Sequence, residues 1–327
     1  MKNNGRYLQL DGWRGLSIIT VIIGHFMPLA DVNLGRLGVE MFFVLSGRLM
    51  AEILFEKHTD LREFFKRRIS RVWPAMFFFL IIAYFVISKL FGQLAFSKLI
   101  FLSCFTFFYN YLEAGFHLGR SITIDHIWSL CVEEHTYILL ALLLVFTKKT
   151  KIKPTIILLP IILLMIFNGI AQTVFYHLDY YHVYWRSDVR GASILIGAYI
   201  YLLFKQKSSL NKKDNLAILF FLLGFLLSFN AVPDFIKYSM GTIFLAIAIN
   251  NLDGLSSSFQ KILTSKVLNW IGLVSFSIYL WQQPFYALKS NYSTPLLLSC
   301  ITILGVLSFY FVEVPARRFL NRLNLWG

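Results

Sequence analysis

Charged side chains are scarce in this sequence. Asp, Glu, Lys and Arg make up 15% of its 327 residues, whereas hydrophobic residues make up 57%. A soluble chain of this length with so little charge would expose too much apolar surface to water. The composition therefore excludes a soluble globular fold and indicates a membrane protein.

Cysteine is also rare, and the common signatures of metal and nucleotide sites are missing. Cys104, Cys131 and Cys300 lie singly within apolar segments and show no metal-ligand or CxxC spacing. We interpret them as packing residues and predict no metal site. No Gly-rich phosphate loop or HExxH motif occurs in the sequence, and no internal repeat is obvious.

Long apolar runs are what the sequence has in abundance. Runs of this length predict membrane helices, because barrel strands are shorter and alternate in polarity. We expect an all-α, polytopic integral membrane protein that forms a single transmembrane domain over residues 1–327, with no soluble appended domain. Eleven apolar segments carry this prediction: 13–30, 38–55, 74–91, 94–112, 127–147, 155–175, 191–204, 216–231, 235–250, 267–288 and 295–314.

Positive charge in the connectors predicts how these segments cross the membrane. Cytoplasmic loops carry an excess of Lys and Arg, and the connector 148–153 falls on the cytoplasmic side only if one earlier segment does not span. The weakest candidate is 94–112, which contains Lys98 and several hydroxyl residues. We therefore expect about ten transmembrane helices plus one interfacial or re-entrant helix, with both termini cytoplasmic in a bacterial-type inner membrane.

Arg14 and His25 lie inside the first apolar segment. They are eleven residues apart, and at about 100° per residue this separation is only about 20° beyond three full turns. On a helix, the two side chains therefore share a face. A charge at the centre of a membrane costs about 3 kcal/mol on insertion scales, so such groups are kept for chemistry or binding. The alternative is that Arg14 reaches the lipid headgroups and His25 is a satisfied buried polar group.

With this topology, polar residues from four spans gather at the depth of His25 in the outer half of the membrane. Charges at membrane depth face a cavity or one another, so we predict a site here. The alternative is an aromatic belt with interfacial charges. The other members are Asp125, His126, Trp128, Glu133, Glu134, His135, Arg186, Asp188, Arg190, Tyr279, Trp281, Gln282 and Gln283.

A basic cluster marks the cytoplasmic side. Arg67, Arg68 and Arg71 come just before Pro74, which we take as the start of a helix. Arginine pairs with phosphate oxygens in a bidentate way, so a polyphosphorylated cytosolic ligand would fit. Positive-inside topology or contact with anionic membrane lipids explains the charge equally well. Nucleic acid is not expected as a partner, because the net charge of +14 is spread over several loops.

Several motifs, in the same order, resemble the membrane acyltransferase-3 family. The first segment, LDGWRGLSIITVIIGHF, carries the family's Arg and His with ten residues between them. GVEMFFVLSGRLM, which contains Glu40, is similar to its second-span motif, and FFKRRISRVWP to its basic motif. The elements IWSLCVEEHTY, RSDVRGASILIG, GLVSFSIYLWQQP and FVEVPARRF match further along the chain.

The resemblance implies an O-acyltransferase that moves an acyl group, usually acetyl, from cytoplasmic acyl-CoA to a hydroxyl of a cell-surface or lipid-linked polysaccharide. His25 would be the general base, because histidine titrates near the working pH. Glu133 or Glu134 would orient His25 or the acceptor, and Arg14 would hold or polarise the donor. Arg67, Arg68 and Arg71 would bind the coenzyme A phosphates. The acceptor would meet Glu40, Trp128, Arg186, Asp188, Arg190, Tyr279, Trp281 and Gln282.

The sequence departs from the family pattern at three positions. Arg48 replaces an apolar residue, His135 a Gln and Gln282 a His. Arg48 could pair with Glu40 or Glu52 or contact substrate, and we expect the structural pair. A proton-coupled transporter or flippase of a glycan or lipid precursor is the alternative function, because an intramembrane Arg, a His and carboxylates also suit proton coupling. Against a transporter, no paired broken helices or inverted repeat are visible.

Overall fold

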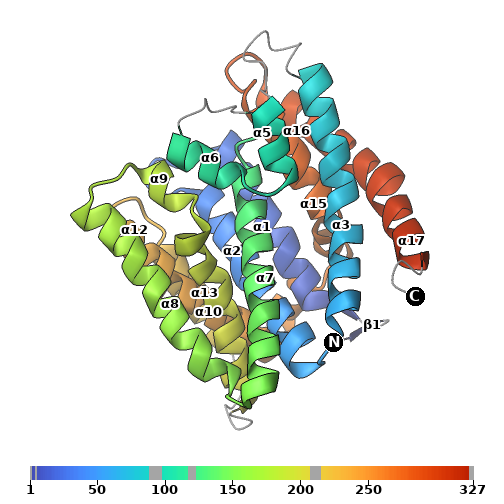
Figure 1. Ribbon diagram of the computed structural model, residues 1–327. Coiled ribbons are helices and arrows are strands. Elements are labelled where there is room, and N and C mark those ends of the chain that lie inside the picture. Colours follow the sequence, from blue (N-terminus) through green and yellow to red (C-terminus); the bar gives the residue numbers. More distant parts are fainter. Residues whose placement is uncertain (1, 4–5, 88–97, 117–122, 207–214, 324–327) are drawn as a thin grey trace. The chain divides into compact units, whose positions relative to one another are not determined.

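The computed structural model describes the chain except for residues 1, 4–5, 88–97, 117–122, 207–214 and 324–327 (Figure 1). The described part is helical apart from two strands of two residues each, β1 (Lys2–Asn3) and β2 (Arg6–Tyr7), which pair antiparallel with Lys2 opposite Tyr7. The prediction of an all-α protein is confirmed for this part of the chain.

The chain divides into two compact units. Unit 1 comprises Met1–His58 and Val132–Leu273, and unit 2 comprises Thr59–Cys131 and Val274–Gly327. Two helices, α7 (Ile127–Thr150) and α15 (Lys266–Tyr286), have residues in both.

The other helices of unit 1 are α1 (Leu8–Phe26), α2 (Leu34–Ala51), η1 (Glu52–Glu56), α8 (Pro154–Ile170), η3 (Ala171–Phe175), α9 (Tyr180–Tyr184), α10 (Ser187–Gln206), α11 (Leu216–Leu226), α12 (Asp234–Ile236), η4 (Lys237–Gly241), α13 (Thr242–Asn250), η5 (Leu252–Gly254) and α14 (Ser257–Leu263). Those of unit 2 are α3 (Leu61–Ile82), η2 (Ala83–Ile87), α5 (Lys98–Phe105), α6 (Tyr109–Phe116), α16 (Thr294–Ser308), η6 (Phe309–Glu313) and α17 (Val314–Arg322). The segments η1, η2, η3, η4 and η6 are π-helical turns continuous with α-helices, and η5 is a 3₁₀ turn.

Five helical segments among the described residues are long and apolar enough to cross a membrane: Leu61–Val86, Ile127–Thr150, Pro154–Phe175, Ser187–Gln206 and Thr294–Arg322. A sixth is counted if α14 and α15, which bend by 42° at their junction, form one span. α1 and α2 are not among these segments. The protein thus has the helices of a membrane protein, and the count of ten spans stays a prediction.

The segment 94–112 forms two helices where we expected one. Residues 94–97 lie outside the described residues, and the rest of the segment belongs to α5 and to the first half of α6, which ends at Phe116. Each helix has eight residues, and Phe107 between them has a φ of +61°. Eight residues span about 12 Å, against about 30 Å for the hydrocarbon core, so neither helix crosses a membrane alone. The interruption at Phe107, in the left-handed region of backbone space, is why a single helix was the wrong expectation.

Glycines let the main helices of unit 1 approach closely. α2 packs against both α1 and α10, and Figure 1 shows α1 and α2 side by side. A Cβ on Gly47 of α2 would lie 1.8 Å from the Ile194 carbonyl oxygen of α10, and one on Gly197 of α10 would lie 2.5 Å from the Val44 oxygen. Small residues at such crossings permit close backbone contact in membrane helices.

In unit 2, α3 packs along α17, and the two lie side by side in Figure 1. The Ser70 hydroxyl of α3 donates to the Asn321 side-chain oxygen of α17 at 2.9 Å. The buried Glu313 of η6 accepts a hydrogen bond from Ser277 of α15 at 2.9 Å. Unit 2 is therefore tied together by polar contacts between its helices as well as by apolar packing.

The prediction that a helix starts at Pro74 was wrong. α3 begins at Leu61, because the Asp60 carboxylate caps it by accepting from the backbone N–H groups of Arg62 and Glu63 at 2.8 and 3.4 Å. Pro74 lies inside α3. The arginines before it are therefore on a helix that continues into the apolar segment.

We expect Gly47→Ala to lower the midpoint of thermal unfolding by several degrees, because its methyl group would collide with the α10 backbone and overpacking costs about 1–3 kcal/mol. Gly241→Ala is the matched control: a Cβ there would meet its nearest neighbour, Leu227 Cβ, at an ordinary 3.6 Å. Thermal unfolding of the two variants in the same detergent makes the comparison. Equal midpoints for both variants would contradict the close crossing of α2 and α10.

Candidate functional site

Arg14 and His25 lie on one continuous helix, α1, as their predicted common face requires. Both side chains are partly buried. Arg14 Nη1 lies 3.0 Å from Asp11 Oδ1, one turn earlier, in an ion pair whose side chains are only 14% and 13% exposed. Asp11 is a partner that our sequence analysis did not assign, and any donor phosphate at Arg14 would share the guanidinium with it.

The His25 ring sits where α1 meets the start of α2. A Cβ on Gly24 would lie 2.0 Å from the Gly35 backbone nitrogen, so the two backbones touch at this crossing. A Cβ on Gly35 would lie 3.2 Å from His25 Nε2 and from Cδ2. The absence of a side chain at Gly35 therefore makes room for the imidazole edge.

Glu133 connects α7 to α2. Its carboxylate accepts from the Ser46 hydroxyl at 3.2 Å and from the Tyr137 hydroxyl at 3.1 Å. Glu134, its neighbour, is partly buried on α7. His135 Nδ1 lies 2.7 Å from the Ser187 hydroxyl oxygen at the start of α10. Glu133 and His135 thus make polar contacts from α7 to α2 and to α10.

Glu40 and Arg190, both predicted to contact substrate, are paired with each other. Arg190 is 1% exposed and donates from Nη2 to Glu40, whose carboxylate also accepts from the Thr242 hydroxyl. This contact joins α2, α10 and α13. The pairing takes up much of the binding capacity of Glu40, and a substrate contact of either residue stays a prediction.

Arg186 and Asp188 form a second pair, at the N-terminus of α10. Arg186 donates from Nε and Nη2 to the two carboxylate oxygens of Asp188, at 3.0 and 2.8 Å. Asn168 of α8 donates to Asp188 at 2.9 Å. The two residues are therefore held in a fixed geometry between α8 and α10, and both remain partly exposed.

The sequence allowed an ion pair between Arg48 and Glu40, but the two residues do not form one in the structure. Its Nη1 donates to the Ile249 carbonyl of α13 at 2.7 Å. Glu52, the other predicted partner, lies 2.6 Å from the ammonium of Lys57. The role of Arg48 in unit 1 is thus a contact between α2 and the end of α13.

The predicted site residues of unit 2 form their own buried group. The Tyr279 hydroxyl donates to the His126 carbonyl at 3.0 Å and lies 2.7 Å from the Ser129 hydroxyl oxygen. The Trp281 ring packs edge-on against Phe79 with centroids 5.4 Å apart. Trp128 is buried near the start of α7, and Gln282 donates to Gln283 at 3.1 Å.

Arg67, Arg68 and Arg71 share one side of α3. Residues 67, 68 and 71 fall within about 100° of arc on an α-helix. The Arg67 side chain is 70% exposed and its Nε lies 2.5 Å from Glu63 Oε1, whereas Arg68 and Arg71 are partly buried. Several guanidinium groups on one face could hold phosphate oxygens, as predicted for coenzyme A.

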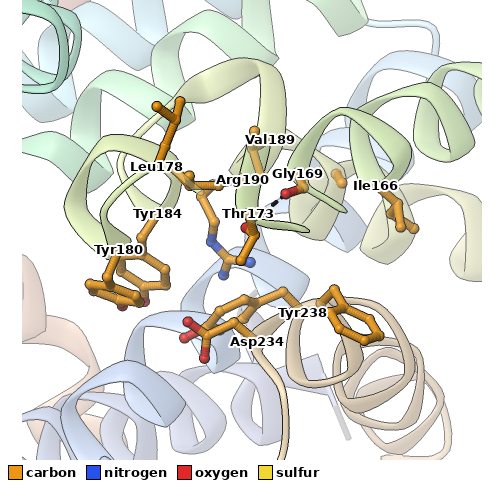
Figure 2. Close-up of a pocket in the computed structure, with 13 residues that line it drawn as sticks. Ile166, Gly169, Thr173, Leu178, Tyr180, Tyr184, Val189, Arg190, Asp234 and Tyr238 are labelled. Carbon is orange, nitrogen blue, oxygen red and sulfur yellow. Dashed lines mark hydrogen bonds between the residues drawn. The ribbon is translucent and has the colours of Figure 1, made fainter. Parts of the chain in front are cut away.

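Sequence reasoning missed an aromatic group beside Arg190. Tyr180 and Tyr184 of α9 stack with centroids 4.8 Å apart, and Tyr238 of η4 lies 5.1 Å from Tyr184. Figure 2 shows these rings around the Arg190 guanidinium, which lies 3.8 Å from the centroid of Tyr238. The aromatic run YYHVYW at 180–185, directly before Arg186, was the signal that could have revealed it.

Comparison with known proteins identifies the family. Residues 7–315 match the Acyl_transf_3 family, which is described as an acyltransferase domain. The chain belongs to this acyltransferase family. It is 29% identical to the peptidoglycan O-acetyltransferase OatA of Listeria monocytogenes over 98% of its length, and 30% identical to the O-acetyltransferase OatA of Staphylococcus aureus over 96%.

The chain spans 58% of the length of these two curated relatives, so the match covers part of each. No solved structure matches the chain. Family membership confirms the resemblance stated from the motifs. It gives the acyltransferase class, and the substrates of this chain belong to the proposal below.

We expect Arg190→Met to lower the free energy of unfolding by about 3–5 kcal/mol, because it leaves the buried Glu40 carboxylate without its cation. The double variant Glu40→Gln with Arg190→Met should recover most of that loss. Arg67→Met, in the exposed pair with Glu63, should cost about 1 kcal/mol or less. Unfolding of all three in detergent is the measurement, and a double variant no more stable than Arg190→Met would argue against the pair.

Proposed function

We propose that this chain is an integral-membrane O-acetyltransferase that moves acetyl from cytoplasmic acetyl-CoA to a hydroxyl of peptidoglycan or of a related surface or lipid-linked glycan. The observation that carries the proposal is the shared helix of Arg14 and His25 in a chain of the acyltransferase family. The named activity of the OatA relatives supports acetyl as the transferred group and peptidoglycan as the acceptor.

In the proposed reaction, His25 accepts the proton of the acceptor hydroxyl. A sugar hydroxyl is a poor nucleophile at neutral pH, so a base must remove its proton as its oxygen attacks the thioester carbonyl. A neutral imidazole at His25 takes that proton, the new C–O bond forms and the C–S bond breaks. The departing thiolate then takes the proton from the imidazolium, which leaves an acetyl ester, free coenzyme A and a neutral His25.

Other polar groups of unit 1 would position these reactants. Glu133, held by Ser46 and Tyr137, would position the acceptor by accepting a hydrogen bond from one of its hydroxyls. Arg14, whose charge Asp11 partly balances, would polarise the thioester carbonyl or contact a donor phosphate.

The donor side is proposed to be cytoplasmic. The Arg67, Arg68 and Arg71 face would bind the coenzyme A phosphates, and the flexible pantetheine arm would carry acetyl towards His25. This assignment to the cytoplasmic side comes from the predicted topology, in which both termini are cytoplasmic in a bacterial-type inner membrane. The acceptor would then meet the residues assigned to the outer half of the membrane, which include Trp128, Arg186, Tyr279, Trp281 and Gln282.

We expect His25→Ala to reduce acetyl transfer by about 100- to 10,000-fold, the contribution of a positioned base, while the protein stays folded. The assay follows label from radioactive acetyl-CoA to solubilised peptidoglycan with purified protein in lipid nanodiscs. His58→Gly is the control, because it removes an exposed histidine whose φ of +49° glycine adopts without strain.

Transfer by wild type and by His58→Gly alone supports the assignment. Equal transfer by His25→Ala would show that His25 is structural and that another group is the base. No transfer by any form, with donor and acceptor both supplied, would contradict the enzyme and favour the transporter alternative.

We expect Arg68→Ala to raise the KM for acetyl-CoA by about 10- to 100-fold with little change in kcat, because a lost charge-assisted hydrogen bond costs about 1.5–3 kcal/mol. Lys149→Ala is the matched control: it removes an exposed cation from a connector expected on the same side of the membrane. Steady-state kinetics over a range of acetyl-CoA concentrations separate the two constants. A KM equal to that of Lys149→Ala would leave the basic cluster with a topological role only.

A further inference from the structure

A cavity of about 170 Å³ lies in unit 1 between α8, η3, α9, α10 and the α12–η4 segment. Figure 2 shows its polar side, where the Arg190 guanidinium lies among Tyr180, Tyr184 and Tyr238, with Asp234 below. Its opposite side is formed by aliphatic residues of α8 and α10, among them Ile166 and Val189. The cavity therefore offers a polar end and an apolar end.

Arg190 lines this cavity and has one donor that no described residue uses. Its Nη2 is committed to Glu40, but its Nε is buried and has no hydrogen-bond partner among the described residues. A buried donor left unsatisfied costs about 1–3 kcal/mol, and more for a charged group. An acceptor atom placed in the cavity would remove that cost.

The charges around the cavity favour an anion. A second cavity, of about 20 Å³, shares Tyr238 with the first, and the charged residues that line the two are Arg36, Lys237, Arg190, Glu40 and Asp234. Arg190 pairs with Glu40, while Arg36 and Lys237 both approach Asp234, at 3.7 and 3.2 Å. Three cations thus meet two carboxylates, and the site carries an excess of one positive charge.

The rim indicates that the ligand also has an apolar part. Leu178 and Phe235 line the cavity and are 43% and 39% exposed. Thr173 of η3, another lining residue, is exposed. Its hydroxyl donates to the Gly169 carbonyl oxygen at 2.8 Å and is therefore not free to bind a ligand as a donor. An amphipathic molecule would place its charged group at Arg190 and its apolar part along this rim.

We propose that this cavity binds an oxyanion, phosphate or carboxylate, carried by an amphipathic molecule. Resting on the proposed function, we assign that molecule as the lipid-carried form of the acceptor glycan, whose anionic group anchors at Arg190 before the hydroxyl reaches His25. The unused Nε suits either oxyanion, because both present an oxygen that accepts a charge-assisted hydrogen bond.

The test is direct binding, with no acetyl donor present. Purified full-length protein in nanodiscs of zwitterionic lipid is incubated with radiolabelled decyl phosphate, and decanoate, decanol and N-acetylglucosamine 1-phosphate serve as competitors. Decyl phosphate should bind saturably, decanoate should compete, and decanol and the sugar phosphate should compete at least tenfold less well. If decanol competes as well as decanoate, the ligand does not need an oxyanion, and the proposal is wrong on that point. If the sugar phosphate competes as well as decanoate, the ligand does not need an apolar part.

Two variants locate the binding. Arg190→Lys keeps a cation for Glu40 and removes the guanidinium fork, and Thr173→Phe fills the rim, so each should weaken decyl phosphate binding at least tenfold. Thr302→Phe is the matched control, because Thr302 of α16 is equally exposed and also donates to the carbonyl four residues earlier at 2.8 Å. Binding by Thr173→Phe that equals binding by Thr302→Phe would refute the cavity as the site.

This outcome is independent of the chemistry. His25→Ala should bind decyl phosphate as wild type does, even though it is expected to lose transfer. Binding without any acetyl transfer in wild type would uphold the oxyanion site and refute the enzyme. Acetyl transfer without decyl phosphate binding would uphold the enzyme and refute the oxyanion site.

Discussion

The contact on which unit 1 depends is the buried ion pair of Glu40 and Arg190. A carboxylate and a guanidinium removed from water must satisfy each other, and Glu40 does so with Arg190 of α10 and Thr242 of α13. Because these partners lie on different helices, the pair specifies which helices meet and at what height. Gly47 and Gly197 then bring the α2 and α10 backbones close enough for the pair to form.

The same constraint explains why the predicted site is only partly free for substrate. Arg186 holds Asp188, Arg14 holds Asp11, and Glu133 accepts from Ser46 and Tyr137. Each contact satisfies a polar group that would otherwise be costly to remove from water. Such contacts also fix the side chains in place, which a catalytic group requires. Structural and catalytic roles are therefore not alternatives for these residues.

Much of the fold could be predicted, because apolar runs of helical length are local features; α1, α8 and α15 begin within a few residues of their predicted segments. Failures arose where a single polar residue decides a boundary: Asp60 starts α3 thirteen residues before the expected proline. The site residues could be listed from motifs, but not their pairing. Glu40 and Arg190 are 150 positions apart, and nothing local in the sequence joins them.

The π-helical turns place a limit on how this sequence can vary in length. At η6, the chain passes from α16 to α17 through one widened turn that includes the buried Glu313. Deleting one residue there would restore α-helical geometry and leave α17 close to its present direction, whereas deleting one residue elsewhere in α16 would rotate everything beyond it by about 100°. Such a rotation would turn Asn321 away from Ser70 of α3, so single-residue deletions should be rarer elsewhere in these helices than at their π-turns.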